Sequence, residues 1–224
     1  MKVSIIIPTL NEGGNLAYVL PRIPNIPEVD EWVIADGHST DNTLQIAREL
    51  LPKVKIVLQD GKGKGNAILC AAKAATGDYF IILDSDGSQM PEEMPLYVEK
   101  AKAGYELVKG SRFLRGGQIE NQPLVRKIIV KTANTIANIV WRTKFSDICY
   151  GMFLIDRRKY LDLDIESTGF NIEWELMIKA KRKGLRIAEI PAQETNRIHG
   201  GTHINYFRDG WMIAKTVFKN AFKK

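Results

Sequence analysis

Two carboxylates one residue apart, Asp84 and Asp86, follow directly on the apolar run at residues 80–83. The run is long enough for a buried strand, and Gly87 and Ser88 end it. Ligands of open α/β sheets bind at the carboxyl ends of the strands, where this acid pair would lie. Carboxylate oxygens suit a hard divalent cation, and Mg²⁺ is usually shared with substrate phosphates. The pair therefore predicts a metal–phosphate site; the alternative is that both acids only end the strand and cap the next helix.

Three earlier apolar runs predict further strands at residues 3–7, 32–35 and 54–58, each followed by a helical pattern. Strands that alternate with helices in this way predict a doubly wound, mostly parallel sheet flanked by helices. The chain has 224 residues, which is enough for a single α/β domain with a complete core. In such a sheet the carboxyl ends of the strands share one edge.

Further polar residues would lie at that edge. Asp36 follows the second predicted strand, where an acid can bind ribose hydroxyls or base N–H groups; the alternative is a turn before Gly37. The loop at residues 61–65, GKGKG, precedes a small-residue helix at 66–75. Its glycines permit a close backbone approach to a ligand, although the spacing is neither that of a P-loop nor that of a dinucleotide-binding fingerprint. Its lysines either contact that ligand or lie in solvent.

The second half of the chain is less regular and more basic. Apolar periodicity predicts a long helix at 123–142, a strand at 152–155, a helix at 172–183 and a strand at 185–190. Residues 112–144 contain seven Lys or Arg residues against one acid, Glu120. Residues 205–224 carry aromatic side chains at helical spacing among five basic residues. A basic amphipathic helix of this kind either lies in a membrane interface or docks on the core of its own domain.

The composition limits the compartment and the partners. The net charge is +6 and the pI is near 9.2, so the excess of base is modest. Cys70 and Cys149 lack metal or disulfide spacing and are expected to be small core residues. No apolar window of about 18 residues predicts a membrane span and the N-terminal run is too short for a signal peptide, so we expect a cytoplasmic protein. Nucleic-acid binding is disfavoured, because the basic stretches outside the C-terminal helix lack interleaved stacking aromatics.

The first half contains, in order, the segments SIIIPTLNE, VIADGHSTDNT, GKGNAI and LDSDGSQMPEE. Their order and spacing resemble those of family-2 glycosyltransferases of the glycosyltransferase-A fold. In the second half GSRF, DICYGMFLIDRR, GFNIEWEL and EIPAQETNRIHGGTHINYFRDGW are similar to the dolichol-phosphate mannose synthase and polyprenyl-phosphate glycosyltransferase branch. The resemblance covers essentially the whole chain. It implies a catalytic domain at residues 1–204, followed by the basic amphipathic helix at 205–224.

Residues 1–104 are implied to form the half that binds the nucleotide-sugar donor. The positions expected at the donor are Pro8, Leu10, Glu12, Asp36, Gly37, Lys64, Asp84, Ser85 and Asp86. Asp84, Asp86 and Ser88 would hold Mg²⁺ or Mn²⁺ against the donor diphosphate. Some synthases have a metal-binding glutamine at the position of Ser88, whereas this chain has Gln89 one residue later.

Residues 105–204 are implied to form the acceptor half. Arg112 of the GSRF segment and Arg126 of the long helix would bind a lipid phosphate, and together with Asp86 they are the expected catalytic residues. The alternative for both arginines is ordinary surface charge. Arg197 and His203 would join them from a segment that closes over the phosphates. That segment usually ends in Ser-Lys and here ends in Thr-His, so its charge would depend on pH.

The implied reaction moves a hexose from a nucleotide diphosphate sugar, GDP-mannose or UDP-glucose, to a polyprenyl or dolichyl phosphate with inversion at the anomeric carbon. A phosphate monoester has a second pKa of about 6 and is largely dianionic at neutral pH, so it needs no general base. Two alternatives are a saccharide or small-molecule hydroxyl acceptor, with Glu173 or Glu175 as the base, and a non-catalytic nucleotide-sugar-binding subunit. A lipid acceptor would place the protein at the cytoplasmic membrane face as a peripheral protein.

Overall fold

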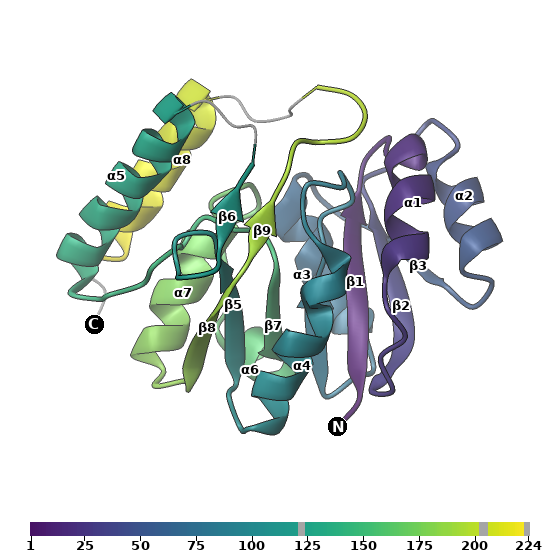
Figure 1. Ribbon diagram of the computed structural model, residues 1–224, viewed down its shortest axis with the longest axis horizontal. Helices are drawn as coiled ribbons and strands as arrows, with labels where there is room; N and C mark the ends of the chain where they lie inside the picture. The colour runs from purple at the N-terminus through teal and green to yellow at the C-terminus, as the bar shows by residue number, and fades with distance from the viewer. Residues whose placement is uncertain (121–123, 202–205, 222–224) are drawn as a thin grey trace.

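Seven strands form the central sheet of the computed structural model, which describes residues 1–120, 124–201 and 206–221 (Figure 1). These strands are β1 (Val3–Thr9), β2 (Val29–Asp36), β3 (Lys55–Leu58), β4 (Tyr79–Ile82), β5 (Leu107–Ser111), β7 (Phe153–Asp156) and β8 (Ile187–Pro191). A separate pair consists of β6 (Gln118–Ile119) and β9 (Gln193–Glu194). The helices are α1 (Gly13–Val19), α2 (Thr43–Leu50), α3 (Lys64–Ala74), α4 (Met94–Lys102), α5 (Leu124–Trp141), α6 (Arg157–Asp162), α7 (Ile172–Arg182) and α8 (Tyr206–Lys219). Short 3-10 helices cover Leu20–Arg22 and Pro91–Glu93.

The strand order is β3-β2-β1-β4-β7-β5-β8. Only β7 runs antiparallel to its neighbours β4 and β5, while the other pairs of this sheet are parallel. The order of the strands reverses between β1 and β4, and doubly wound sheets bind ligands at such a switch point. The predicted mostly parallel sheet is therefore confirmed. The direction of β7 was not predicted, because its apolar run has the same character as those of the parallel strands.

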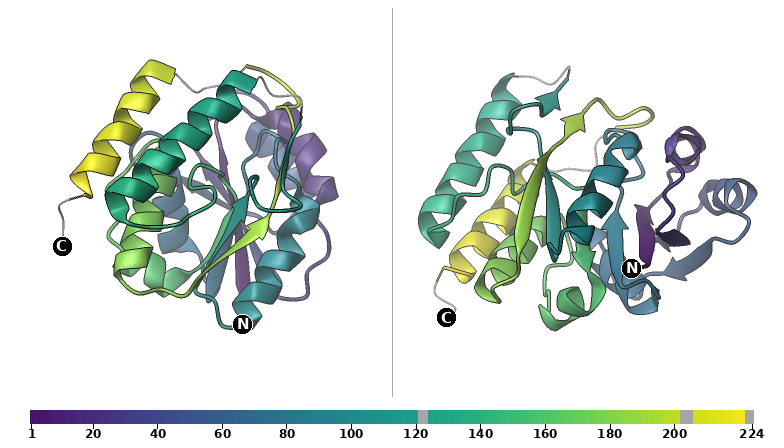
Figure 2. Two further views of the ribbon diagram at one scale, coloured as in Figure 1. Left: turned by 60° about the vertical axis from the view of Figure 1, so that its left-hand side comes forward. Right: turned by 60° about the horizontal axis from the view of Figure 1, so that its bottom comes forward.

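Helices cover both faces of the sheet, which is why its central strands are apolar at nearly every position. Successive residues of β1 alternate between the two faces. Ile5 and Ile7 pack on the side of α1, α2 and α4, whereas Ile6 packs on the side of α3 and α7. Figure 2 shows these two layers from other directions. The two apolar cores hold the strands in place along their length. They therefore also fix where the polar residues at the carboxyl ends of the strands lie.

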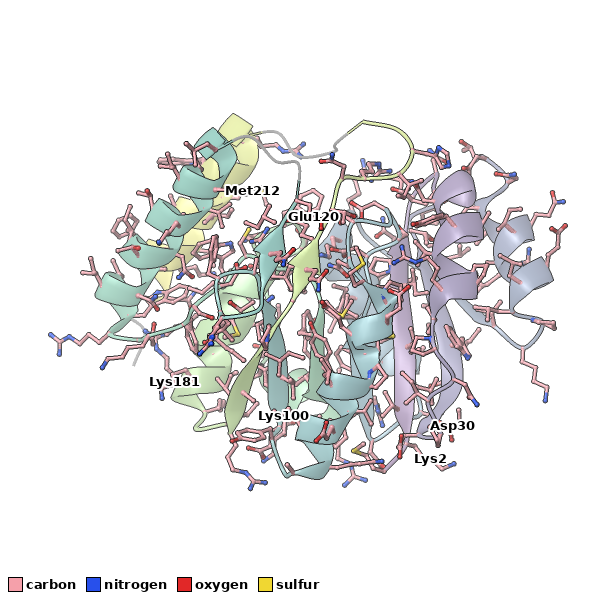
Figure 3. The ribbon with its side chains drawn as sticks, viewed as in Figure 1. Lys2, Asp30, Lys100, Glu120, Lys181 and Met212 are labelled. Carbon is pink, nitrogen blue, oxygen red and sulfur yellow. The ribbon has the colours of Figure 1, made fainter. Side chains whose placement is uncertain are left out.

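Helices α5 and α8 lie side by side at the β8 end of the sheet (Figures 1 and 2). Trp141 Nε1 of α5 donates to the Val217 carbonyl of α8 at 3.0 Å, and Asn171 Nδ2 donates to Thr216 Oγ1 at 2.8 Å. Met212, labelled in Figure 3, packs near Gly169. One face of α8 thus docks on its own domain, as one of the two sequence interpretations expected. Within the three described stretches of chain, no helix is both long enough and apolar enough to cross a membrane.

The core packing predicts the effect of a truncation in β4. Phe80 is fully buried and packs edge-on against Phe153 and Tyr160. We expect Phe80→Ala to lower the free energy of unfolding by about 3–5 kcal/mol, because it removes buried apolar surface and leaves a cavity. Phe218→Ala is the control, since Phe218 is 55% exposed, and its change should stay within about 0.5 kcal/mol. Urea denaturation measures both; equal losses would contradict the described core.

Candidate active site

The ends of β1 and β2 bring together the residues predicted to bind a nucleoside. Asp36 is fully buried and accepts hydrogen bonds from Thr9 Oγ1 at 3.1 Å and from the Ser39 amide at 2.8 Å. Its neighbour Gly37 is closely packed, because a Cβ there would lie 3.2 Å from the Thr9 carbonyl oxygen and 3.4 Å from Leu10 Cβ. Leu10 itself is 46% exposed. The result is a fixed carboxylate beside an exposed apolar side chain.

The two acids of the D-x-D segment lie just beyond β4, next to the end of β1. Asp84 Oδ1 lies 2.7 Å from Lys64 Nζ, and Asp84 Oδ2 accepts from Gln89 Nε2 at 2.7 Å. Asp86 Oδ1 accepts from the Ser88 amide at 3.0 Å and from Ser88 Oγ at 2.7 Å. Ser85, between the acids, turns its hydroxyl to the Pro8 carbonyl at 2.9 Å and so ties this loop to β1.

These residues fit a divalent cation that is shared with a diphosphate. Each carboxylate oxygen can accept more than one contact, so Asp84 and Asp86 retain acceptor capacity beyond the contacts already described. Burial raises the pKa of Asp84 and Lys64 opposes that rise, which means that positive charge is favoured beside this carboxylate. Among the residues that the structure describes, no group of three or more His, Cys, Asp or Glu side chains is arranged to hold a metal. Ser88, water and the diphosphate would therefore supply the remaining oxygen ligands, as Mg²⁺ sites commonly do.

The glycine-rich loop packs against the protein itself. Helix α3 begins at Lys64, and the Thr168 carbonyl accepts from the Gly65 amide at 2.8 Å. A Cβ at Gly63 would lie 2.4 Å from the Thr168 carbonyl oxygen, and one at Gly65 would lie 2.2 Å from that of Ser167. The expectation that these glycines make room for a ligand is thus wrong at these two positions: they make room for the chain that precedes α7. This close packing directs Lys64 toward Asp84.

Residues 195–199 form a strap over the D-x-D segment. The Thr195 amide donates to the Ser88 carbonyl at 2.8 Å, and the Ile198 amide donates to the Asp86 carbonyl at 3.1 Å. Arg197 pairs with Glu12, and its Nη1 lies 3.7 Å from Asp86 Oδ2. The structure therefore places Arg197 beside Asp86, the predicted metal ligand. Its predicted contact with an acceptor phosphate stays a prediction.

The strap is anchored at its far end as well. The His199 amide donates to Asn15 Oδ1 at 2.8 Å, and Asn15 Nδ2 donates back to the His199 carbonyl at 3.2 Å. Asn15 also donates to Glu12. The segment thus runs from the acid pair to α1, across the ends of the strands between them. His203 lies outside the described residues.

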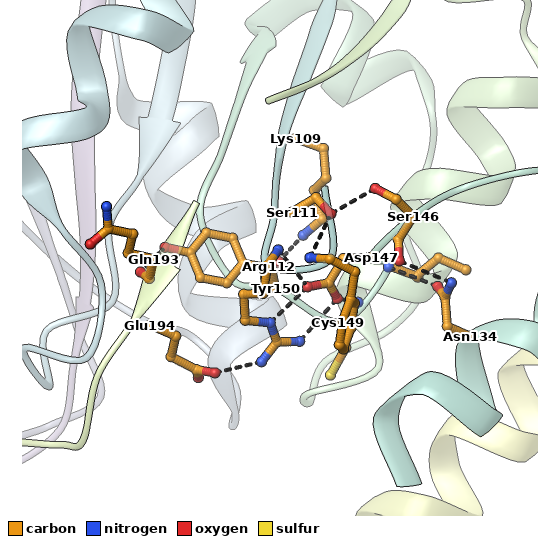
Figure 4. Close-up of polar contacts among 12 residues, drawn as sticks. Lys109, Ser111, Arg112, Asn134, Ser146, Asp147, Cys149, Tyr150, Gln193 and Glu194 are labelled. Atoms are coloured by element: carbon orange, nitrogen blue, oxygen red, sulfur yellow. Dashed lines mark hydrogen bonds and ion pairs between the residues drawn. The ribbon is translucent and has the colours of Figure 1, made fainter. Parts of the chain in front are cut away.

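Arg112 is buried and doubly paired (Figure 4). Its Nε and Nη2 donate to the two carboxylate oxygens of Asp147 at 2.7 and 2.9 Å, and its Nη1 donates to Glu194 Oε2 at 2.6 Å. The guanidinium joins the end of β5 to β9. Binding a lipid phosphate would require part of this arrangement to open, and that role stays a prediction. Arg126 belongs to α5, but its side chain lies outside the described part of the chain.

The residues that complete these contacts were not predicted in these roles, and Glu173 was named only as an alternative general base. Glu173 of α7 accepts from Lys64 Nζ at 2.8 Å and is 3% exposed. Gln89, Asp147 and Glu194 hold the acid pair or Arg112 as described above. The signal for Glu173 is a carboxylate inside the apolar segment GFNIEWEL, since a buried acid requires a partner. The identity of that partner, 109 residues away, is not readable from the pattern.

The two glutamates that were candidate bases are each paired with a lysine. Glu173 is held by Lys64. Glu175 lies 2.6 Å from Lys179 Nζ and accepts from the Ser167 amide at 2.7 Å, and these contacts lower its pKa against the effect of burial. Glu175 therefore fixes the loop before α7, and each of the two carboxylates is paired with a lysine.

The chain is similar to several known proteins. The model of a family described as glycosyl transferase family 2 matches residues 4–163. The chain is 34% identical over 229 residues to a dolichol-phosphate mannosyltransferase from Pyrococcus furiosus, with 96% of this chain and 64% of that protein covered. It is 31% identical over 229 residues to a polyprenol monophosphomannose synthase from Mycolicibacterium smegmatis, with 97% and 84% covered. The chain thus spans less than two thirds of the first relative's length and most of the second's.

The fold is similar to that of glucosyl-3-phosphoglycerate synthase from Mycobacterium tuberculosis. Its complex with Mn²⁺, UDP-glucose and phosphoglyceric acid superposes with a TM-score of 0.75 at 22% identity, covering 98% of this chain and 79% of that one. The complex with phosphoglyceric acid alone gives a TM-score of 0.73 at 22% identity, with 98% and 80% covered. At this level of identity the likeness establishes the fold, and it confirms the predicted glycosyltransferase-A architecture.

One group near the strap gives the structure a pH dependence. Glu93 Oε1 accepts from the Gln193 amide at 2.9 Å, while its buried Oε2 has no partner among the described residues. Burial raises the pKa of Glu93 to about 7. The folded state therefore binds more protons than the unfolded state between pH 4.5, the ordinary value, and pH 7. Stability should accordingly fall as the pH rises through that window.

We expect Glu93→Gln to remove this loss of stability at higher pH. The glutamine carbonyl can still accept from the Gln193 amide, and it carries no charge. Relative to the wild type, the variant should gain thermal stability between pH 5 and pH 8, as measured by melting temperatures at both pH values in one buffer system. A difference between the two proteins that does not change with pH would contradict the assignment to Glu93.

Proposed function

This chain belongs to glycosyltransferase family 2, and from that premise we propose that it transfers a hexose from a nucleotide diphosphate sugar to a polyprenyl phosphate, with inversion and with Mg²⁺ or Mn²⁺. The names of the two curated relatives support the acceptor class and favour mannose as the sugar. The observation that carries the proposal is the convergence of Asp36, Asp84 and Asp86 at the carboxyl ends of β2 and β4, the two strands that flank β1, while the candidate bases Glu173 and Glu175 are each paired with a lysine.

The donor would lie across the ends of β1, β2 and β4. Asp36 has its carboxylate fixed by Thr9 and Ser39, so it can present one orientation to a ribose or base. Leu10 offers an apolar surface beside it. Asp84, Asp86 and Ser88 would hold the cation, which supplies positive charge to the leaving diphosphate when bound. Glu12 would act at the same end, where it orients Arg197.

The acceptor phosphate would approach from the second half of the chain. A dianionic phosphate oxygen is already a nucleophile, so the protein needs to position it rather than deprotonate it. The engagement of Glu173 and Glu175 supports this acceptor over a hydroxyl group, which would require a base. Arg112, Arg126, Arg197 and His203 are the proposed phosphate-binding residues. Arginine suits this role because its planar donors match phosphate geometry.

A lipid acceptor also needs a surface that meets the membrane, and we place it on α5 and α8. Both helices expose large apolar side chains: Leu124, Ile128, Ile129, Ile136 and Ile139 on α5, and Trp211 and Phe218 on α8. Ile139 and Trp211 are each 73% exposed. Lys131, Lys215 and Lys219 are exposed on the same two helices. Aromatic and basic residues together favour an anionic interface, and the protein would lie there as a peripheral protein at the cytoplasmic face.

A transfer assay tests the proposed reaction. Purified protein would be offered GDP-mannose or UDP-glucose, Mn²⁺ or Mg²⁺, and either a polyprenyl phosphate or the matching free polyprenol. We expect transfer only to the phosphate. Asp86→Asn should lower turnover at least about hundredfold, because the cation loses charge neutralisation by a direct ligand.

The same variant should keep the wild-type melting temperature, since the described contacts of the Asp86 side chain are with Ser88 of its own loop and with Arg197, and its backbone contact with Ile198 is unchanged. Transfer to the free polyprenol at a comparable rate would favour the hydroxyl alternative. Undiminished transfer by Asp86→Asn would contradict the metal site, and binding of the nucleotide without any transfer would favour the non-catalytic alternative.

Liposome binding tests the proposed membrane surface. We expect Trp211→Ser and Phe218→Ser each to weaken binding to anionic liposomes about tenfold, since each removes a side chain worth roughly 1.5–3 kcal/mol when buried in an apolar medium. Matched controls are Leu50→Ser and Leu58→Ser, which are 42% and 54% exposed on α2 and β3. Cosedimentation with vesicles measures all four. Equal losses in variants and controls would contradict the assignment of this surface to α5 and α8.

A further inference from the structure

We propose that Glu173 is a positioning residue that holds Lys64 as an internal counter-charge to Asp84, and thereby sets the affinity of the site for its divalent cation. This inference rests on the proposed function in one respect, because it takes Asp84 as a ligand of the cation. It assigns Glu173 a role other than that of a general base, and it assigns Lys64 a role before any donor is bound.

The geometry is a short chain of three charged groups. Lys64 Nζ lies 2.7 Å from Asp84 Oδ1 and 2.8 Å from Glu173 Oε1. The side chain of Lys64 is 11% exposed and that of Glu173 is 4% exposed, so water screens these contacts poorly. The two carboxylates come from different halves of the chain, and the ammonium group links them. Charged groups buried to this extent require partners, and here each finds one.

The surrounding backbone leaves the ammonium little freedom to lie elsewhere. A Cβ at Gly151 would be 2.1 Å from Asp84 Oδ2, 2.6 Å from Gln89 Nε2 and 3.0 Å from Lys64 Nζ. The bare backbone of Gly151 thus forms one wall of the cluster. The backbone of Lys64 is held as well. Lys64 is the first residue of α3, and the Thr168 carbonyl fixes this first turn by accepting from the Gly65 amide at 2.8 Å. Lys64 is held from its backbone to its ammonium group.

Charge balance gives the consequence for a cation. Asp84, Lys64 and Glu173 carry a net charge of −1 together, and a bound cation would add +2 beside Asp84. Lys64 opposes the cation by like charge and by occupying Asp84 Oδ1. Glu173 counteracts both effects, because it adds negative charge nearby and offers Lys64 a second carboxylate. The loss of Glu173 should therefore weaken cation binding twice over, and the loss of Lys64 should strengthen it.

Mn²⁺ binding, followed by electron paramagnetic resonance without any turnover, tests this inference on the full chain. The titration would be done with and without a nucleoside diphosphate. We expect Glu173→Gln to bind Mn²⁺ about tenfold more weakly and Lys64→Met about tenfold more tightly, from the Coulomb energy of one unit charge near a divalent ion at partly screened distance. The double variant removes one charge of each sign, so its affinity should return to within about threefold of the wild type.

Glu175→Gln is the matched control. It lies two residues further along α7, is buried to a similar degree and is also paired with a lysine, but that pair lies away from the acid segment. It should alter thermal stability without altering the Mn²⁺ affinity. A purely structural role for Glu173 predicts the same behaviour for Glu173→Gln, so a stability change without an affinity change in that variant would overturn the inference.

The double variant keeps the test decisive if a single variant does not fold, since it leaves neither Lys64 nor Glu173 as an unpaired charge. Its affinity, if it departs from the wild type by about tenfold or more, would overturn the proposed compensation. Normal Mn²⁺ binding by the wild type with an unchanged Glu173→Gln variant would overturn only this inference. Failure of the wild type to bind Mn²⁺ in either condition would overturn the metal site of the proposed function, and this inference with it.

Discussion

The structure depends on the compensation of negative charge that is crowded at one edge of a sheet. Asp36 ends β2 while Asp84 and Asp86 follow β4, on either side of β1; Asp36 is fully buried and the side chain of Asp84 is 25% exposed. Charged groups in such surroundings must be hydrogen-bonded or paired, because burial alone favours their neutral forms. Asp36 is satisfied locally, by Thr9 and Ser39. Asp84 is paired with Lys64, and Asp86 lies beside Arg197. Both basic side chains come from other parts of the fold.

Several elements of the second half of the chain hold Lys64 and Arg197 in position. Helix α7 supplies Glu173 to hold Lys64, and the loop before it closes on the first turn of α3. The antiparallel strand β7 matters here because it places Gly151, two residues before its start, against Asp84. Beyond β9, the strap carries Arg197 to Glu12 and Asp86. Arg112 ties β9 to the body of the domain through Glu194. The second half of the chain thus takes part in building the site at the ends of β1 and β4.

This interdependence explains what could be read from the sequence and what could not. Local patterns predicted the strands, their mostly parallel order and the acids at their ends, because burial on both faces and strand termination are properties of short segments. The predicted glycine-rich loop illustrates the limit: a glycine signals close approach, but the approaching group turned out to be Thr168 of the same chain. Arg112 was identified from the GSRF segment of the resembled family, while its partner Asp147 lies 35 residues away. Long-range ion pairs are fixed by tertiary packing, and a single sequence does not reveal them.

The pairing of buried acids with basic side chains also bears on which acceptor the site suits. An enzyme that activates a hydroxyl must keep one carboxylate free and suitably basic near the reacting carbon. Here the buried glutamates of α7 are committed to Lys64 and to the loop that packs on α3. A phosphate acceptor removes the need for such a base and replaces it with a need for positive charge, which the second half of the chain has in excess. The exposed apolar residues of α5 and α8 are on that same half. The proposed phosphate acceptor thus fits the same half of the chain in which the two candidate bases, Glu173 and Glu175, are each paired with a lysine.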